Sequence, residues 1–150
     1  MTEFVLARRA EGLHWFQLKI GGDPAPDAAR ARRIVEATGS EDIVIGDANC
    51  GWRLNEAIIA ARAMEDLPRF YFEQPCPTME ECIEVRRHTS LPMVYDEVVS
   101  DVATLLRADP QGSPSVRTCR HSGKVPLPEL RTAATEGTTA TVIGSPRQHG

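Results

Sequence analysis

Three acidic residues and one lysine stand at the ends of short apolar runs, where they could hold a metal ion and move a proton. The acidic residues are Asp47 in IVIGDAN, Glu73 in FYFEQP and Asp96 in MVYDE, and the lysine is Lys19 in FQLKIGG. Successive members are 28, 26 and 23 residues apart, about the length that a strand, a helix and their two connecting loops need. The spacing predicts that all four side chains lie at the carboxyl ends of neighbouring parallel strands.

Carboxylates gathered in this way favour one chemistry. Three acids at one edge of a sheet repel one another unless a cation lies between them, and carboxylate oxygens are the ligands that Mg²⁺ prefers. Asp47, Glu73 and Asp96 are therefore predicted ligands of Mg²⁺, with Mn²⁺ as an alternative. Lys19 is the candidate base, because a nearby cation favours a neutral amine that can take a proton. A small molecule with an acidic hydrogen next to its carboxylate would suit this pairing.

The segments that position these residues alternate between helical and strand patterns as far as residue 108. Helices are predicted over 2–11, 24–35, 54–64, 79–88 and 101–106, and strands over 14–20, 43–46, 70–72 and 93–95. Continuous apolar runs such as 43–46 are typical of strands that are buried on both faces. The pattern predicts an α/β fold, a partial TIM (β/α) barrel of about four central βα units with parallel strands.

The composition changes near residue 108, and residues 109–150 are predicted to form a poorly ordered tail. Every aromatic residue lies at or before Tyr95, and glycine, proline, serine and threonine make up 20 of the 41 residues from 110 to 150. Such a segment buries too little apolar surface to offset its ordering entropy. Only Thr139–Gly144 resembles a strand. Two origins are equally open, a genuine disordered tail or linker and an out-of-frame translation of a GC-rich gene.

Composition excludes several classes of protein. A net charge of −4 argues against a nucleic-acid-binding surface. No segment approaches the ~20 apolar residues of a membrane span, and the amino terminus lacks an apolar signal core. The expectation is a cytoplasmic protein with neither a nucleic-acid nor a membrane partner. The four cysteines have no CxxC spacing, so neither a zinc site nor a redox pair is predicted.

The four motifs together resemble those of a known group of enzymes. KIG from Lys19, DAN from Asp47, EQP from Glu73 and DE from Asp96 are similar to the barrel motifs of the enolase superfamily, in its mandelate racemase and muconate lactonizing branch. The resemblance covers about residues 4–107. The segments FQLKIGGDP, DANCGW and FEQPCPTMEEC are most similar to members that act on hydroxyproline or proline betaine as dehydratases or epimerases.

The resemblance implies a reaction. Asp47, Glu73 and Asp96 correspond to the family's three magnesium ligands, and Lys19 corresponds to the second lysine of a KxK motif, which acts on one face of the substrate. The implied activity is Mg²⁺-dependent removal of the α-proton from an amino- or hydroxy-acid carboxylate. Racemisation, epimerisation or dehydration of a hydroxyproline-like small molecule would follow, and full-length relatives are expected to be homo-oligomers.

The same resemblance implies that three further residues lie close to the site. Gln17 stands where the first lysine of the KxK motif often is, which puts a neutral amide in place of a group that neutralises the substrate carboxylate. Asn49 and Glu97 correspond to neighbours of the metal ligands, and hydrogen bonding within the loops is an equally strong interpretation of both.

The chain is shorter than the barrel that it resembles. A complete TIM barrel takes about 250 residues, and this chain has 150. The family's capping domain and first barrel strand have no counterpart before Thr2. Barrel strands six to eight, with the acid/base for the other face of the substrate, are not predicted after residue 108, and Lys124 is not assigned that role because no strand precedes it. The expectation is a barrel fragment that is inactive alone.

Three alternatives remain open for the chain as a whole. It could be a noncatalytic α/β module that a partner completes, or an inactive gene remnant. It could also be a small binding domain whose acidic residues are only surface charges, in which case no metal dependence is expected.

Overall fold

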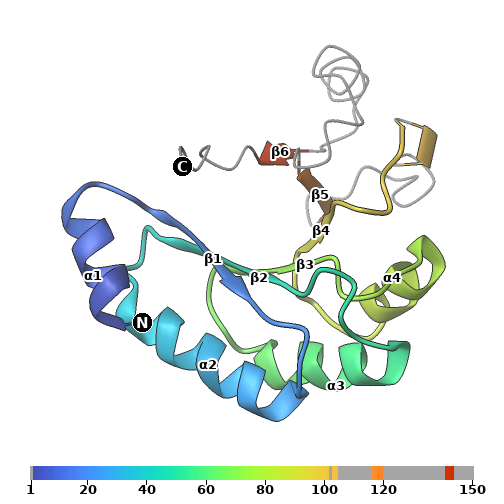
Figure 1. Ribbon diagram of the computed structural model, residues 1–150, viewed down its shortest axis with the longest axis horizontal. Coiled ribbons are helices and arrows are strands. Elements are labelled where there is room, and N and C mark those ends of the chain that lie inside the picture. Colours follow the sequence, from blue (N-terminus) through green and yellow to red (C-terminus); the bar gives the residue numbers. More distant parts are fainter. Residues whose placement is uncertain (1, 102, 105–115, 120–140, 144–150) are drawn as a thin grey trace.

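The computed structural model (Figure 1) describes residues 2–101, 103–104, 116–119 and 141–143. Helices and strands alternate along most of this length, and the strands form one parallel sheet in chain order, β1-β2-β3-β4-β5-β6. The elements are α1 (Thr2–Ala10), β1 (Trp15–Lys19), α2 (Pro24–Ala37), β2 (Ile43–Asp47), α3 (Leu54–Met64), β3 (Phe70–Glu73), α4 (Met79–Arg86), β4 (Met93–Tyr95), β5 (Val116–Cys119) and β6 (Thr141–Ile143). Parallel strands in sequential order with helical crossovers are the wall of a β/α barrel, so the predicted partial barrel is confirmed.

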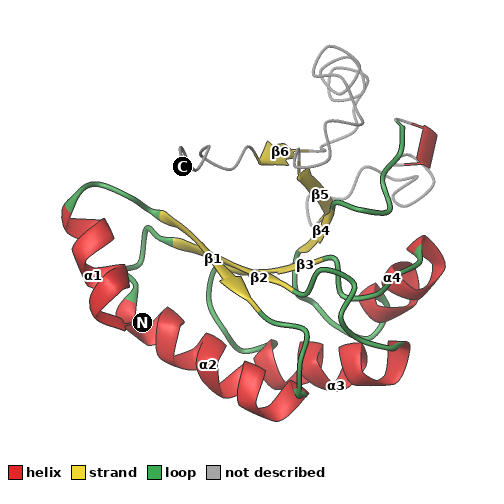
Figure 2. Ribbon diagram, viewed as in Figure 1, coloured by secondary structure: helices red, strands yellow, loops and turns green. Residues whose placement is uncertain are grey.

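The helices cover one face of the sheet. Figure 2 shows α1 to α4 below a sheet that bends away from them toward β5 and β6. The main core lies on this face, where Leu18 and Phe72 of the strands belong to the same buried cluster as Ile34 of α2 and Met64 of α3. Each large apolar side chain that is fully buried in this way stabilises the fold by about 1.5–3 kcal/mol.

The opposite face of the sheet has a smaller apolar cluster. Ile45 and Val94 are buried there, and Ile43 and Tyr71 pack against them. Side chains alternate between the two faces of a strand, so Ile43 and Ile45 point the same way as Asp47, two residues further along β2. The carboxyl end of this second face is therefore polar, and its middle is apolar.

Local sequence signals fix where the helices begin. Asp23 caps α2, since its side chain accepts a hydrogen bond from the Ala25 amide at 3.1 Å. Thr78 caps α4: its hydroxyl oxygen accepts from the Glu81 amide at 3.2 Å and donates to the Glu81 carboxylate at 2.8 Å. Each cap satisfies a backbone amide in the first turn of its helix and so fixes where that helix begins. The loops that follow the polar ends of β1 and β3 are therefore short.

The segment beyond residue 108 differs in part from its prediction. β6 falls within Thr139–Gly144, where a strand was expected, but β5 was not expected, because a four-residue strand between Gly-, Pro- and Ser-rich stretches has too weak a pattern. Both strands pair in parallel, β5 with β4 and β6 with β5. Residues 103–104 of the helix predicted over 101–106 are helical, while residues 102, 105 and 106 and Lys124 lie outside the described residues. The division into 1–108 and 109–150 stays a prediction.

No helix among the described residues is both long enough and apolar enough to span a bilayer.

Candidate metal and proton-transfer site

Three of the predicted site residues lie at matching positions on adjacent strands. Lys19, Asp47 and Glu73 are the last residues of β1, β2 and β3, and the parallel register pairs Lys19 with Asp47 and Asp47 with Glu73. Asp96 directly follows β4, two residues beyond Val94, which is the register partner of Glu73. The predicted placement of all four residues at the carboxyl ends of successive strands is therefore correct.

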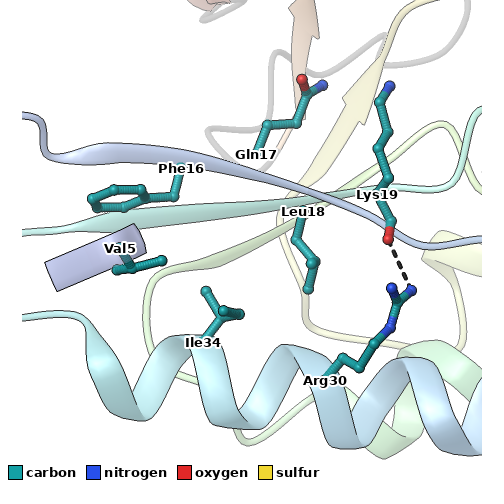
Figure 3. Close-up of a pocket in the computed structure, with 7 residues that line it drawn as sticks. All are labelled: Val5, Phe16, Gln17, Leu18, Lys19, Arg30 and Ile34. Atoms are coloured by element: carbon teal, nitrogen blue, oxygen red, sulfur yellow. Dashed lines mark hydrogen bonds between the residues drawn. The ribbon is translucent and has the colours of Figure 1, made fainter. Parts of the chain in front are cut away.

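Their side chains project from the face of the sheet that the helices do not cover. Figure 3 shows Gln17 and Lys19 extending from β1 away from α2, whereas Leu18 points toward Ile34 of that helix. Asp47 is the register partner of Lys19, and register partners in a sheet share a face. A row of polar side chains thus crosses the strand ends on the barrel-interior side.

One amide nitrogen joins the two central carboxylates. Gln17 Nε2 donates to Asp47 Oδ2 at 2.8 Å and to Glu73 Oε2 at 3.2 Å. Asp47 and Glu73 are buried, with 3% and 1% of their surfaces exposed. Neighbouring buried carboxylates repel each other unless donors or cations lie between them, and the Gln17 amide supplies such a donor to both.

The lysine reaches the same carboxylate from the solvent side. Lys19 Nζ donates to Asp47 Oδ2 and, at 2.6 Å, to Asn49 Oδ1. Asn49 in turn donates from its backbone amide to Asp47 Oδ1 at 3.0 Å and from Nδ2 to Glu97 Oε1 at 2.9 Å. The structure therefore gathers Gln17, Asn49 and Glu97 around Asp47 and Lys19.

Close packing of two loops brings Lys19 next to Asn49. Gly21 has a φ of +111°, and a Cβ built on it would lie 2.5 Å from the carbonyl oxygen of Ala48. Only glycine fits this position, so the loop after β1 can lie directly against the loop after β2. Trp52 fastens the two loops, because its Nε1 donates to the Gly22 carbonyl at 2.6 Å while its ring stacks on Phe72 with 5.6 Å between the ring centroids.

Asp27 of α2 is a supporting residue that the sequence analysis did not identify. It is buried, and its Oδ2 accepts hydrogen bonds from the amides of Gly21 and Gly22, both at 2.8 Å. Arg30 pairs with Asp27 Oδ1 and donates to the Lys19 carbonyl at 2.9 Å. An acidic residue in the first turn of a helix is common, so nothing in the sequence distinguished this one.

Asp96 is held by its backbone. Its amide donates to the side-chain oxygen of Gln74 at 2.9 Å, and the residue is buried with 8% of its surface exposed. Within the part of the chain that the structure describes, no three His, Cys, Asp or Glu side chains are close enough to hold one metal ion. Asp47 and Glu73 are drawn together by Gln17, and Asp96 occupies the next strand end.

The donor set fits a hard cation. Asp47 and Glu73 are adjacent, buried and able only to accept when ionised, and oxygen ligands of this kind suit Mg²⁺ or Mn²⁺. Positively polarised donors, Gln17 Nε2 and Lys19 Nζ, already converge on Asp47 Oδ2. Two carboxylates at adjacent strand ends thus supply oxygen ligands of the type that such a cation takes.

The Cys50 thiol lies beside the cluster, in surroundings that favour its protonated form. Burial, with the negative charges of Glu97 and Asp47, raises the pKa of Cys50. A thiol that stays protonated is a poor nucleophile and a poor metal ligand.

A pocket of about 270 Å³ lies beside β1, and none of the carboxylates Asp47, Glu73 and Asp96 lines it. Figure 3 shows Leu18, Ile34 and Arg30 on the helix side of the strand, opposite the amine of Lys19. It is lined by Val5, Phe16, Gln17, Leu18, Lys19, Arg30 and Ile34. This pocket is a gap between the first strand and its helices, separate from the row of carboxylates.

Curated proteins and family models give relatives for this chain. A family model described as "Enolase C-terminal domain-like" matches residues 1–116. Cis-3-hydroxy-L-proline dehydratase from Roseibium aggregatum is 43% identical over 107 residues, which cover 71% of this chain and 29% of that protein. An o-succinylbenzoate synthase from Mycobacterium tuberculosis is 46% identical over 80 residues, which cover 53% of this chain and 24% of that protein.

Solved structures agree with these relatives. A mandelate racemase/muconate lactonizing enzyme from Roseovarius nubinhibens has a TM-score of 0.79 at 33% identity, covering 95% of this chain and 39% of that one. A member of the enolase superfamily from the same organism, complexed with magnesium, has a TM-score of 0.78 at 26% identity and covers 94% of this chain and 39% of its own. The chain spans less than half the length of these relatives.

Proposed function

The chain belongs to the enolase C-terminal domain-like family, as its motifs indicated, and we propose that it supplies part of the active site of a Mg²⁺-dependent enzyme of the mandelate racemase and muconate lactonizing type. The observation that carries the proposal is the row of Lys19, Asp47 and Glu73 at three adjacent strand ends, with Gln17 joining the two carboxylates. Polar residues so placed at the carboxyl face of a β/α barrel are typical of an active site.

Asp47, Glu73 and Asp96 would hold the metal ion, whose binding would draw the three carboxylates closer together than they lie in the described residues. Bound Mg²⁺ would offset the negative charge that develops on a carboxylate substrate when its α-proton leaves. The magnesium complex of a relative with 26% identity and a TM-score of 0.78 supports this choice of metal. Mn²⁺ prefers similar oxygen ligands and is a suitable substitute.

Lys19 would take the α-proton on one face of the substrate. Its Nζ lies between two acceptors, Asp47 Oδ2 and Asn49 Oδ1. When the amine gains a proton, these acceptors stabilise the ammonium that forms. Asn49 is itself oriented by Glu97, to which its amide donates at 2.9 Å. Gln17 would keep Asp47 and Glu73 convergent without adding a second positive charge.

The proposed substrate is a small amino- or hydroxy-acid carboxylate of the hydroxyproline type. The dehydratase from Roseibium aggregatum supports it, because that relative matches more of this chain than the o-succinylbenzoate synthase does. Dehydration is accordingly the reaction that we favour. Racemisation and epimerisation are the other reactions that can follow removal of an α-proton. The complete reaction belongs to the longer proteins of the family.

Metal titration tests the proposal most directly. The chain should bind Mg²⁺ and Mn²⁺ in isothermal calorimetry, and Asp47→Asn or Glu73→Gln should each weaken binding by at least about tenfold, because each removes a charged ligand. Asp66→Asn is the matched control, since Asp66 is an exposed carboxylate that pairs with Arg32. Identical isotherms for the original chain and both ligand variants would refute the metal assignment.

A further inference from the structure

Gln74, the residue after Glu73, joins three strand-end loops through its backbone and its side chain. It is fully buried, and its φ of 38° lies in the left-handed region that a non-glycine residue rarely adopts. Its amide donates to the Val94 carbonyl at 2.9 Å, and its carbonyl accepts from the Cys50 amide at 2.9 Å. The backbone of this one residue therefore ties the end of β3 both to β4 and to the loop after β2.

The side chain of Gln74 makes contacts in two directions. Its Oε1 accepts a hydrogen bond from the backbone amide of Asp96 at 2.9 Å. Its Nε2 donates to the Cys76 carbonyl at 2.9 Å and lies 3.6 Å from Cys82 Sγ. A primary amide offers an acceptor and two donors on one rigid plane, so it satisfies Asp96 on one side and the loop before α4 on the other.

We propose that Gln74 is a positioning residue for Asp96, whose backbone it fixes at the carboxyl end of β4. This inference rests on the proposed function, in which Asp96 is a metal ligand, but the geometry that carries it is independent of the metal. The loop beyond β4 is anchored to β3 at Asp96 by a side-chain contact, because the regular pairing of these strands ends at Glu73 and Val94. Gln74 continues the link between β3 and β4 past the end of the sheet.

Gln74 could instead act only as a well-satisfied core residue, and the chain contains a matched control for that role. Cys82 is also fully buried and contacts the Nε2 side of the same amide. Cys82→Ala would disturb the core at this point while leaving the hydrogen bond between Gln74 Oε1 and the Asp96 amide in place. Gln74→Met keeps a side chain of similar volume but removes that acceptor.

The test compares amide exchange and metal affinity in the full chain. By NMR, Gln74→Met should make the Asp96 amide exchange at least about fivefold faster relative to the Phe72 amide, and it should weaken Mn²⁺ binding about fivefold, as expected for one lost hydrogen bond. The Phe72 amide donates to the Pro92 carbonyl at 2.9 Å and reports the general stability of the β3–β4 pairing. Cys82→Ala should leave both the exchange ratio and the affinity unchanged.

Each outcome decides between the two roles. An unchanged exchange ratio in Gln74→Met, or equal loss of Mn²⁺ affinity in Cys82→Ala, would overturn the positioning role. If the original chain binds no Mn²⁺, the proposed function fails, while the exchange ratio still decides the role of Gln74. If Gln74→Met does not fold, Gln74→Glu serves instead: it keeps an acceptor for Asp96, so its exchange ratio should match the original chain, and a raised ratio would contradict the inference.

Discussion

Lys19 and Asp47 are register partners at the carboxyl ends of β1 and β2, and the ammonium of Lys19 donates a hydrogen bond to Asp47 Oδ2. Their surroundings differ greatly: 62% of the Lys19 side chain is exposed, compared with 4% of the Asp47 side chain. The Asp47 carboxylate is buried, whereas most of the Lys19 side chain, the proposed base, is exposed to solvent.

We expect this exposure to prevent turnover by the 150-residue chain alone. Removal of an α-proton requires an amine that is shielded from competing water, and the Lys19 side chain is open to solvent. In D₂O with Mg²⁺, the α-hydrogen of cis-3-hydroxy-L-proline should exchange at the background rate, measured by NMR, with the original chain and Lys19→Ala indistinguishable. Exchange that depends on Lys19 would show that the chain shields its site sufficiently.

A second prediction concerns Gly46, which lies in β2 directly before Asp47. A Cβ at this position would lie 2.4 Å from Phe70 Cζ and 2.8 Å from Ile20 Cδ1. Gly46→Ala should therefore lower the free energy of unfolding by about 1–3 kcal/mol, because both neighbours are buried in the core. Urea denaturation measures this difference.

Gly22→Ala is the control for Gly46→Ala. The nearest atom to a Cβ on Gly22 is Asp27 Oδ2 at 3.7 Å, an ordinary van der Waals contact. This variant should change the free energy of unfolding by less than about 0.5 kcal/mol. If Gly46→Ala lowered the free energy of unfolding no more than Gly22→Ala does, the close contacts at Gly46 would relax without cost.

The sequence allowed good prediction of the strand ends. The predicted strands ended at Ile20, Gly46 and Phe72, each one residue from the observed ends at Lys19, Asp47 and Glu73. The bounds of α3 and β4 match the predicted ranges. These features depend on neighbours in the sequence, such as alternation, capping residues and the length of an apolar run. Local signals therefore sufficed to place the candidate site in the fold.

Contacts between distant strands could not be predicted in the same way. The hydrogen bonds from Gln17 to Asp47 and Glu73 join residues 30 and 56 positions apart, and they depend on the register of three strands together. The left-handed backbone of Gln74 is another tertiary effect, since nothing in its local sequence calls for a positive φ. The hydrogen bonds that hold the carboxylates in place therefore became apparent only from the folded structure.

A third prediction concerns the coding DNA. The first 109 residues contain 12 basic and 19 acidic residues, whereas the remaining 41 contain 5 and 2. If a frameshift produced this change, one of the other two frames after about codon 108 should encode an apolar strand with a lysine near its end, then a Gly-rich loop and an amphipathic helix. Stop codons in both frames, or the absence of any such pattern, would favour a genuine tail.

The last prediction concerns acid stability and centres on Asp42, whose carboxylate ties α1 to the loop before β2. Its side chain is fully buried and accepts hydrogen bonds from the Gly39 amide at 2.6 Å and from His14 Nδ1 at 2.7 Å, and it also pairs with Arg9. Burial alone would raise the pKa of Asp42, but the Gly39 amide, the His14 ring and the Arg9 guanidinium together hold it below the ordinary value of 3.8.

Because the pKa of Asp42 is lower in the folded chain than in the unfolded chain, its ionised form stabilises the fold. That contribution is fully present above about pH 4 and is lost as the pH falls through the folded-state pKa. Asp42→Asn should lower the free energy of unfolding at pH 7 and make it less dependent on pH between about 5 and 2, measured by urea denaturation at each pH. Asp23→Asn, at an exposed cap where asparagine serves equally well, is the control. Curves for Asp42→Asn that run parallel to those of the original chain over this range would show that the acid sensitivity arises elsewhere.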